Sequence, residues 1–508
     1  MRQILKFKIL SILFLTCVIS LYSKQDSTRI DIKGAINQNL ILTNDLESII
    51  NNPEFNNALI GVYVKSMETG EVLFKKNDEK NFITASILKL LTTSTALELL
   101  GENYQFKTSL YLDGNISDNG NFYGNIIIKG SGDPSMSNYF YEDPSVVVDF
   151  FARCLDSIGI KTIRGNIIGD DKCFDNKYYA PGWSWEDMDY WFSAQINGLS
   201  IYDNTVDIKI YPSNKLIEQP SIIVSPTNTY MRVFNHLISV PKNEPLIIEP
   251  IKDIKTNTLE LYGKVPVGNS NDNTEILSIT VDNPTLYFLN LFKESLDRQQ
   301  LKFRGSIIDI DDWSGEVKYS NLQKICDFYS PNLLEIISVI NRTSHNLCAV
   351  MILKTFSLNK SGEGSFSKGI NEVKKYLSKK GIPPEKIEIV DGSGLSRYNF
   401  LSPKIIVTLL TSIYNSKYRD IFINTLAQPG KIGSLQRRMT GSRAEKNVYA
   451  KTGTMNNISN LAGYVRTRDG EMLAFCIMMM NFTVQEMDAQ NLQDLICMLL
   501  ASYTRKNN

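Results

Sequence analysis

The chain has 508 residues, 43% of them hydrophobic, and its 54 basic side chains are balanced by 54 acidic ones. That is enough apolar material for several globular domains, and it excludes a disordered protein or one that coats nucleic acid. Because the sequence has only two histidines, His236 and His345, it leaves little scope for a Ser-His-Asp triad or a multi-histidine metal site.

The first 23 residues have the pattern of a secretory signal peptide. Arg2, Lys6 and Lys8 precede an apolar run over 9–19 that is too short to span a bilayer, and polar residues follow it. An uncleaved anchor is the alternative. No other segment of the sequence is long and apolar enough to cross a membrane, so we expect an exported, periplasmic protein, soluble or peripherally associated with the cell wall or membrane.

Two kinds of sequence pattern follow the predicted signal peptide. Residues 58–77 alternate apolar and polar side chains on either side of Gly70, which indicates a hairpin, and 83–101 follow as a helix. From about 107 to 315, short alternating runs separated by Asn, Gly, Asp and Pro are typical of β-rich modules. Helical periodicity then returns, and two strands surround a turn near the end. This order predicts one α/β unit interrupted by a β-rich insertion.

Six cysteines follow the signal peptide, and none of them forms a C-x-x-C pair. Most lie in apolar runs, where a buried free thiol behaves as a small hydrophobe, so we expect no metal site. Disulfides are compatible with an oxidising compartment, but a chain of this size does not need them. The six are Cys154, Cys173, Cys326, Cys348, Cys476 and Cys497.

Ser86 stands three residues before Lys89 in the apolar stretch ITASILKLLTT. On a helix this spacing projects both side chains from one side, one turn apart, on an element that packing can immobilise. The S-x-x-K pattern also occurs twice within 357–368, a polar, glycine-broken stretch that cannot hold two side chains on a rigid face. The pattern at Ser86 is therefore a candidate nucleophile with its base, although by itself it is more often structural.

Two further motifs favour the catalytic interpretation. Lys451-Thr452-Gly453 is the only K-T-G in the chain and begins an apparent strand, where a glycine lets a ligand lie against the edge backbone. Ser344-His345-Asn346 forms an S-x-N in the break between two helical runs. Each motif is weak alone, but the three together have the expected order and local structure.

S-x-x-K, S-x-N and K-T-G in this order are the signature of penicillin-recognising serine enzymes, both β-lactamases and penicillin-binding proteins. The 258-residue gap between the first two motifs, against 107 residues between the last two, resembles the class C low-molecular-mass penicillin-binding proteins. These are the D-alanyl-D-alanine carboxypeptidase/endopeptidases of serine peptidase family S13. GSGDPS, APGWSWED, LSIYDNTVDI and DGSGLSRYN resemble further signatures of this family.

The resemblance implies an α/β fold: a penicillin-binding/β-lactamase-like transpeptidase domain, an antiparallel sheet flanked by helices, interrupted by a β-rich insertion of two domains. We expect the catalytic domain over 40–106 and 316–508. The inserted β-rich domain is expected over 107–131 and 221–315, with a second domain over 132–220 nested inside it.

The resemblance also implies acyl transfer to Ser86. A serine hydroxyl needs a base, and with histidine scarce the nearest candidate is Lys89, whose amine becomes neutral if desolvation and the charge of Lys451 favour that form. Ser344 is expected to relay the proton to the leaving amine, and Asn346 to hold the substrate amide. His345 is expected to be a spacer that points away from the nucleophile.

The K-T-G strand is expected to bind substrate. Thr452 and Thr454, with Lys451, are placed to bind a terminal carboxylate, and Gly453 belongs to the same substrate-binding set. The backbone N–H groups of Ser86 and Thr454 would form the oxyanion hole. One departure from the family is Ile432 in PGKIGSLQRRM, where relatives usually carry an aspartate, so a polar role at that position is not expected.

The resemblance further suggests a reading site for a diaminopimelate side chain. Its members are Asp187 for the ammonium, Arg397 for the carboxylate and Met455 for the apolar stem. The alternative is that Asp187 caps a loop and Arg397 pairs with a structural carboxylate.

We therefore predict a serine D-alanyl-D-alanine carboxypeptidase, also acting as a D,D-endopeptidase, whose partners are peptidoglycan peptides and whose covalent inhibitors are β-lactam antibiotics. No nucleic acid, metal or cofactor is expected, and the oligomeric state is left open. The alternatives are a β-lactamase and a non-catalytic wall-binding or β-lactam-sensing protein; a structural adhesin would explain the β-rich insertion but not the K-T-G strand.

Overall fold

The computed structural model describes residues 38–253, 256–269 and 275–505. The predicted signal peptide lies outside these residues. Within them, no helix has both the length and the apolar character that a membrane span requires.

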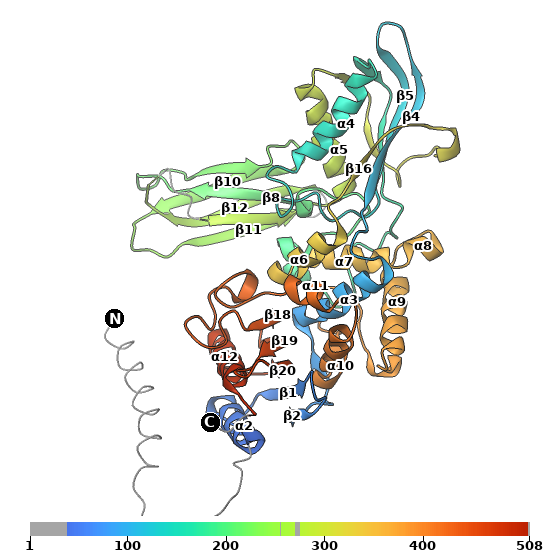
Figure 1. Cartoon of the computed structure of the whole chain (residues 1–508). Helices are drawn as coiled ribbons and strands as arrows, with labels where there is room; N and C mark the ends of the chain where they lie inside the picture. Colours follow the sequence, from blue (N-terminus) through green and yellow to red (C-terminus); the bar gives the residue numbers. More distant parts are fainter. Residues whose placement is uncertain (1–37, 254–255, 270–274, 506–508) are drawn as a thin grey trace, which may run out of the picture.

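A five-stranded antiparallel sheet forms the centre of the lower half of the molecule, with strand order β18-β19-β20-β1-β2 (Figure 1). Its first strand, β1, pairs along its whole length with β20 from the end of the chain. The two predicted hairpins of this unit are confirmed as β1–β2 and β19–β20. The strands are β1 (Leu59–Ser66), β2 (Val72–Lys76), β18 (Val448–Met455), β19 (Ile458–Arg466) and β20 (Met472–Met480).

Helices cover both faces of this sheet, which is why β19 and β20 are buried along nearly their whole length. Helices α2 and α12 pack on one face, and α3 and α10 pack on the other with a larger group of helices behind them. The helices are α2 (Gln38–Ile50), α3 (Lys89–Leu99), α6 (Leu333–Thr343), α7 (Asn346–Thr355), α8 (Leu358–Ser361), α9 (Phe366–Lys379), α10 (Pro403–Tyr414), α11 (Arg419–Thr425) and α12 (Glu486–Ser502).

The predicted helix over 83–101 begins later than expected. Phe82–Ile83 forms a short strand, β3, that pairs with β17 (Phe400–Leu401), and a 3-10 turn, η2 (Ala85–Leu88), leads into α3. The start of the helix is displaced because the chain first joins another segment, which the apolar periodicity of 83–101 does not reveal.

The insertion occupies the upper half of Figure 1 and contains a seven-stranded sheet with the helices α4 and α5 packed against it. The sheet has the main order β14-β6-β5-β4-β16, and β7 and β15 extend it beside β5. These elements are β4 (Lys107–Ile116), β5 (Asn121–Lys129), α4 (Ser145–Ser157), β6 (Thr162–Arg164), β7 (Ile167–Asp170), α5 (Pro284–Arg298), β14 (Lys302–Arg304), β15 (Ile307–Asp309) and β16 (Gln323–Tyr329).

Two three-stranded sheets complete the insertion, with orders β13-β8-β9 and β10-β12-β11. In Figure 1 the second of these projects to one side of the molecule. The strands are β8 (Thr205–Tyr211), β9 (Ser221–Ser225), β10 (Arg232–Val240), β11 (Ile247–Asp253), β12 (Thr258–Pro266) and β13 (Glu275–Thr280).

The mixed α/β architecture with a β-rich insertion is confirmed, but the predicted boundaries do not follow the strand pairing. The boundary at 131/132 separates β5 from its partners β6 and β7, and the boundary at 220/221 separates β8 from β9. Strand β16, predicted to lie in the catalytic domain, pairs with β4 of the insertion. We propose that the outer inserted domain comprises 107–204 and 281–329, with 205–280 nested inside it.

Candidate active site

Ser86 lies in the 3-10 turn between β3 and α3, and its backbone is held from the central sheet. The side-chain amide of Asn460, on β19, donates hydrogen bonds to the carbonyl oxygens of Ile83 at 2.9 Å and Thr84 at 2.8 Å. Ala85, directly before the serine, has a φ of 43°, a left-handed conformation that costs about 1–3 kcal/mol outside glycine. This turn presents the serine at the start of a buried helix instead of within it.

Two glycines let other segments approach this turn closely. A Cβ atom on Gly394 would lie 1.8 Å from the carbonyl oxygen of Ala85, so that loop can pack there only with a glycine. A Cβ atom on Gly453 would lie 3.0 Å from the Ser86 nitrogen. The K-T-G strand therefore runs against the N–H side of the serine turn, as a shared oxyanion hole requires.

The Lys89 side chain is fully buried and ends among three oxygen atoms. Its Nζ atom donates to Asn346 Oδ1 at 2.6 Å and to the Ser393 carbonyl oxygen at 2.6 Å, and it lies 2.8 Å from Ser86 Oγ. The first two oxygens can only accept hydrogen bonds, whereas a hydroxyl can also donate. A neutral amine has two protons and one lone pair, so this arrangement directs the lone pair to the Ser86 hydroxyl.

Burial and charge both favour the neutral amine. Burial holds the pKa of Lys89 well below its ordinary value, and the positive charge of Lys451 lowers it further, while Asp391 and Cys348 raise it. Burial also lowers the pKa of Lys451, to about 7. The Lys451 ammonium donates to the carbonyl oxygen of Thr452 at 2.9 Å.

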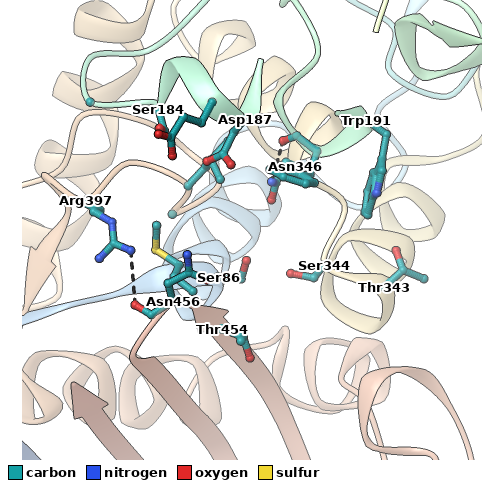
Figure 2. A pocket seen from close by; sticks show the side chains of 16 residues that line it. Ser86, Ser184, Asp187, Trp191, Thr343, Ser344, Asn346, Arg397, Thr454 and Asn456 are labelled. Carbon is teal, nitrogen blue, oxygen red and sulfur yellow. Dashed lines mark hydrogen bonds between the residues drawn. The ribbon is translucent and has the colours of Figure 1, made fainter. Parts of the chain in front are cut away.

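The S-x-N motif joins α6 to α7. Ser344 ends α6 with a left-handed φ of 67°, and Asn346 begins α7. The Asn346 amide is oriented by the insertion, because its Nδ2 donates to the carbonyl oxygen of Phe192 at 2.8 Å while its Oδ1 accepts from Lys89. Figure 2 shows Ser86, Ser344 and Asn346 facing one opening.

The K-T-G motif lies on β18, an edge strand of the central sheet whose outer side is bridged to Ala427 at Ala450, so beyond that bridge one side of its backbone is available to a ligand. Lys451 is buried, and Thr454 is exposed. The Thr452 hydroxyl donates to Ser434 Oγ at 2.8 Å. Ser434, two residues after Ile432, was not identified from the sequence, where a polar role was considered only at position 432.

A cavity of about 530 Å³ opens at Ser86. Its wall contains seven of the eleven predicted site residues, while Lys89, Lys451, Thr452 and Gly453 do not line it. The seven are Ser86, Asp187, Ser344, Asn346, Arg397, Thr454 and Met455. The insertion also contributes residues to the wall that the sequence interpretation missed, among them Glu186, Trp191 and Phe192.

Asp187 and Arg397 lie on the side of this cavity away from Trp191 (Figure 2). Arg397 Nη2 donates to the backbone carbonyl of Asn456 at 3.3 Å, not to a structural carboxylate. The loop hydrogen bonds at Asp187 are made by its backbone, whose N–H donates to the Ser184 carbonyl. Burial raises the pKa of the Asp187 carboxyl, Glu186 raises it further, and Arg397 lowers it.

The two histidines occupy different environments. His345 is 1% exposed; its Nδ1 accepts from the Cys348 N–H at 3.3 Å and thereby caps α7, and its Nε2 lies 3.1 Å from Asp203 Oδ1 of the insertion. His236, on β10, is half exposed and stacks on Tyr262. His345 thus contacts the insertion, and its cap of α7 and its contact with Asp203 give it more than the spacer role expected from the sequence.

Within the described residues, no group of three or more His, Cys, Asp and Glu side chains could hold a metal ion. The six cysteines in that part of the chain are free thiols.

The model of the D-Ala-D-Ala carboxypeptidase 3 (S13) family matches residues 42–503. A D-alanyl-D-alanine carboxypeptidase of Actinomadura sp. (strain R39) is 29% identical over 448 residues, which cover 86% of this chain and 80% of that protein. The D-alanyl-D-alanine carboxypeptidase DacB of Haemophilus influenzae is 25% identical over 447 residues, 86% of this chain and 88% of that protein. The resemblance inferred from the motifs is therefore confirmed.

The fold is similar to that of a solved protein. The crystal structure of penicillin binding protein 4 (dacB) from Haemophilus influenzae matches with a TM-score of 0.78 at 24% identity, covering 91% of this chain and 99% of that one. A structure of the same protein with a β-lactam matches with a TM-score of 0.73 at 23% identity, covering 89% and 97%.

His345→Ala is expected to lower the free energy of unfolding by about 2–4 kcal/mol, because it removes a helix cap and the contact of Nε2 with Asp203 Oδ1, leaving Asp203 bound through Oδ2 to Ser137. Urea unfolding followed by circular dichroism measures the change. His236→Ala, at a half-exposed position, is the matched control and should change stability by no more than about 0.5 kcal/mol. Equal stability of the two variants would show that the buried contacts of His345 are unimportant.

Proposed function

Because this chain belongs to the D-Ala-D-Ala carboxypeptidase 3 (S13) family, it is a serine-type D-Ala-D-Ala carboxypeptidase, and we propose that it acts on peptidoglycan stem peptides through an acyl-enzyme at Ser86. One observation carries the proposal: the buried Lys89 amine, with two acceptors for its protons, lies 2.8 Å from the Ser86 hydroxyl. Lys89 therefore acts as the base for that hydroxyl.

Acylation proceeds by attack of Ser86 Oγ on the carbonyl carbon of the penultimate D-alanine, while Lys89 takes the hydroxyl proton. The C–N bond to the terminal D-alanine then breaks, and Ser344 relays a proton to the leaving amine. The N–H groups of Ser86 and Thr454 stabilise the oxyanion, which is worth about 3–4 kcal/mol per donor in such sites. Water hydrolyses the resulting ester and restores the serine.

The free edge of β18 supports binding of the peptide as an added strand, in which Gly453 keeps the backbone approach open. The terminal carboxylate is held by the Lys451 ammonium and by the hydroxyls of Thr452 and Thr454. The hydrogen bond from Thr452 to Ser434 fixes the rotamer of that threonine.

The side of the cavity that contains Asp187, Arg397 and Met455 reads the diaminopimelate side chain of the stem peptide. Arg397 faces the cavity with a backbone partner, so its remaining donors are available to a carboxylate. The Asp187 carboxylate in the cavity wall is suited to an ammonium group. The same residues would accept a cross-linked peptide, which supports endopeptidase activity beside carboxypeptidase activity.

We infer export to the periplasm from the basic residues and short apolar run at the start of the sequence. Peptidoglycan lies in that compartment. The mature enzyme would be soluble or peripherally associated with the wall or membrane.

Wild-type protein treated with benzylpenicillin should gain one penicilloyl group at Ser86, and Ser86→Ala should gain none. Lys89→Met, which keeps the volume of the buried side chain without a base, should acylate at least about 100-fold more slowly. Intact-mass spectrometry against time measures both rates. An adduct that persists in Ser86→Ala would refute the proposal.

The histidine variants are the controls for the base. Folded His345→Ala and His236→Ala should acylate at close to the wild-type rate per folded molecule. If they lost as much activity as Lys89→Met at matched thermal stability, the lysine mechanism would be wrong.

The kcat/KM for a D-Ala-D-Ala peptide should fall as the pH rises above about 7. Lys451 has a pKa of about 7, so above that pH it loses the charge that attracts the terminal carboxylate. The loss should appear mainly in KM, because a bound carboxylate stabilises the ammonium form. Steady-state kinetics between pH 6 and 9 test this, with a methyl-ester peptide as control; an equal fall for the ester would exclude Lys451 as the anchor.

Asp187→Asn and Arg397→Ala should each reduce the preference for a diaminopimelate-like peptide over an acetyl-lysine peptide by about tenfold or more, because each leaves a charged group of the substrate unpaired. The ratio of kcat/KM for the two peptides measures the preference. Glu186→Gln is the matched control for loss of an acid in the same wall. An unchanged preference in both variants would mean that the insertion does not read the peptide through these residues.

A further inference from the structure

The loop over 391–399 is organised by the carboxylate of Asp391, which is fully buried. Its Oδ1 accepts hydrogen bonds from the Ser393 N–H at 2.9 Å and the Gly394 N–H at 2.7 Å, and it lies 3.2 Å from the Asn399 amide. A carboxylate that accepts several hydrogen bonds from one loop fixes its backbone. The loop conformation therefore depends on this side chain.

The second oxygen of Asp391 connects this loop to the insertion. Oδ2 accepts from the Ser396 N–H at 2.9 Å and from the indole Nε1–H of Trp183 at 2.9 Å. Trp183 is buried and belongs to the segment 181–193, which also contributes Asp187 to the cavity wall.

Both oxygens that accept from the Lys89 amine are held by this same segment. The Ser393 carbonyl belongs to the loop that Asp391 fixes, and Asp391 is bound by Trp183. The Asn346 side chain is bound by the Phe192 carbonyl at the other end of the segment. The insertion thus reaches the base through two separate hydrogen-bonded chains.

We propose that Asp391 is a positioning residue for Lys89: it holds the Ser393 carbonyl against the amine and connects the amine, through Trp183, to the segment of the insertion that lines the substrate cavity. This inference rests on the proposed role of Lys89 as the base. Asp391 does not touch the reacting atoms; it acts through the loop and through its charge.

Because Asp391 is charged, its removal should also change how the acylation rate depends on pH. The charged or titratable groups that act on the Lys89 amine are Lys451 from β18, Asp391 from the loop and Cys348 from α7. Lys451 favours the neutral amine, and Asp391 favours the ammonium form. Removing the Asp391 charge should therefore move the acidic limb of the acylation profile to lower pH, because Lys89 then stays neutral in more acidic solution.

The test compares Asp391→Asn, Trp183→Phe and the wild type in their rates of acylation by a fluorescent penicillin between pH 5 and 10, corrected for the folded fraction. Asp391→Asn should lower the plateau rate by about 10- to 100-fold, since a small displacement of a catalytic group has such effects, and should shift the acidic limb downward. Trp183→Phe keeps the Asp391 charge and an aromatic ring but removes the indole N–H. It should therefore lower the plateau rate by about tenfold without shifting the acidic limb of the pH profile.

A matched control comes from α3. The Thr92 hydroxyl donates to the carbonyl oxygen of Gly392 at 2.7 Å, so Thr92→Val loosens the same loop from another side and leaves Asp391 in place. Thr92→Val should lower the melting temperature and leave the acidic limb of the acylation pH profile unshifted.

Each outcome has a distinct meaning. A wild-type plateau in folded Trp183→Phe would overturn the connection to the insertion, even if Asp391→Asn failed to fold. An unshifted limb in folded Asp391→Asn would overturn the positioning role. Wild-type acylation by Lys89→Met would instead refute Lys89 as the base and with it the proposed function.

Discussion

The site depends on burying the Lys89 amine away from water while keeping it within hydrogen-bonding distance of three oxygen atoms. An isolated ammonium in the interior costs several kcal/mol, so Lys89 is stable only when neutral or when its surroundings are arranged around it. Its two fixed acceptors, from Asn346 and Ser393, belong to separate segments far along the chain. The fold has to bring the serine turn, the break between α6 and α7, and a loop before α10 to one point.

The central sheet and the insertion divide this task. The sheet supplies the turn at Ser86 through Asn460 and an open edge at β18. The insertion supplies the remaining wall of the cavity and hydrogen bonds that orient Asn346 and the Asp391 loop. A region that looks in the sequence like a separate β-rich module is therefore structurally part of the site. Its segment 181–193 both lines the cavity and makes the hydrogen bonds that orient Asn346 and Asp391.

Local patterns were enough to predict the hairpins, the helices after residue 330, the three motifs and the interrupted α/β architecture. Contacts between distant segments were not predictable in this way: alternation identifies β5 and β8 as strands but not their partners, and nothing near Asn460, Ser434 or Phe192 indicates what each binds. The stretch over 357–368 is another place where the local pattern was not enough to predict the structure. Its polar residues and glycines were expected to prevent a rigid face, yet Ser365 caps α9 by accepting from the Lys368 N–H.

The pairing of β1 with β20 has a consequence for synthesis of the enzyme. Ser66 lies opposite Leu473, so the centre of the catalytic sheet unites the two ends of the chain, and its formation has a high contact order. While a ribosome is still making β18 to β20, the nascent chain contains the reactive serine and the whole insertion but no sheet to hold them together. The insertion can fold first as a unit, and a chain that stops before β18 lacks both Lys451 and the strand that pairs with β1.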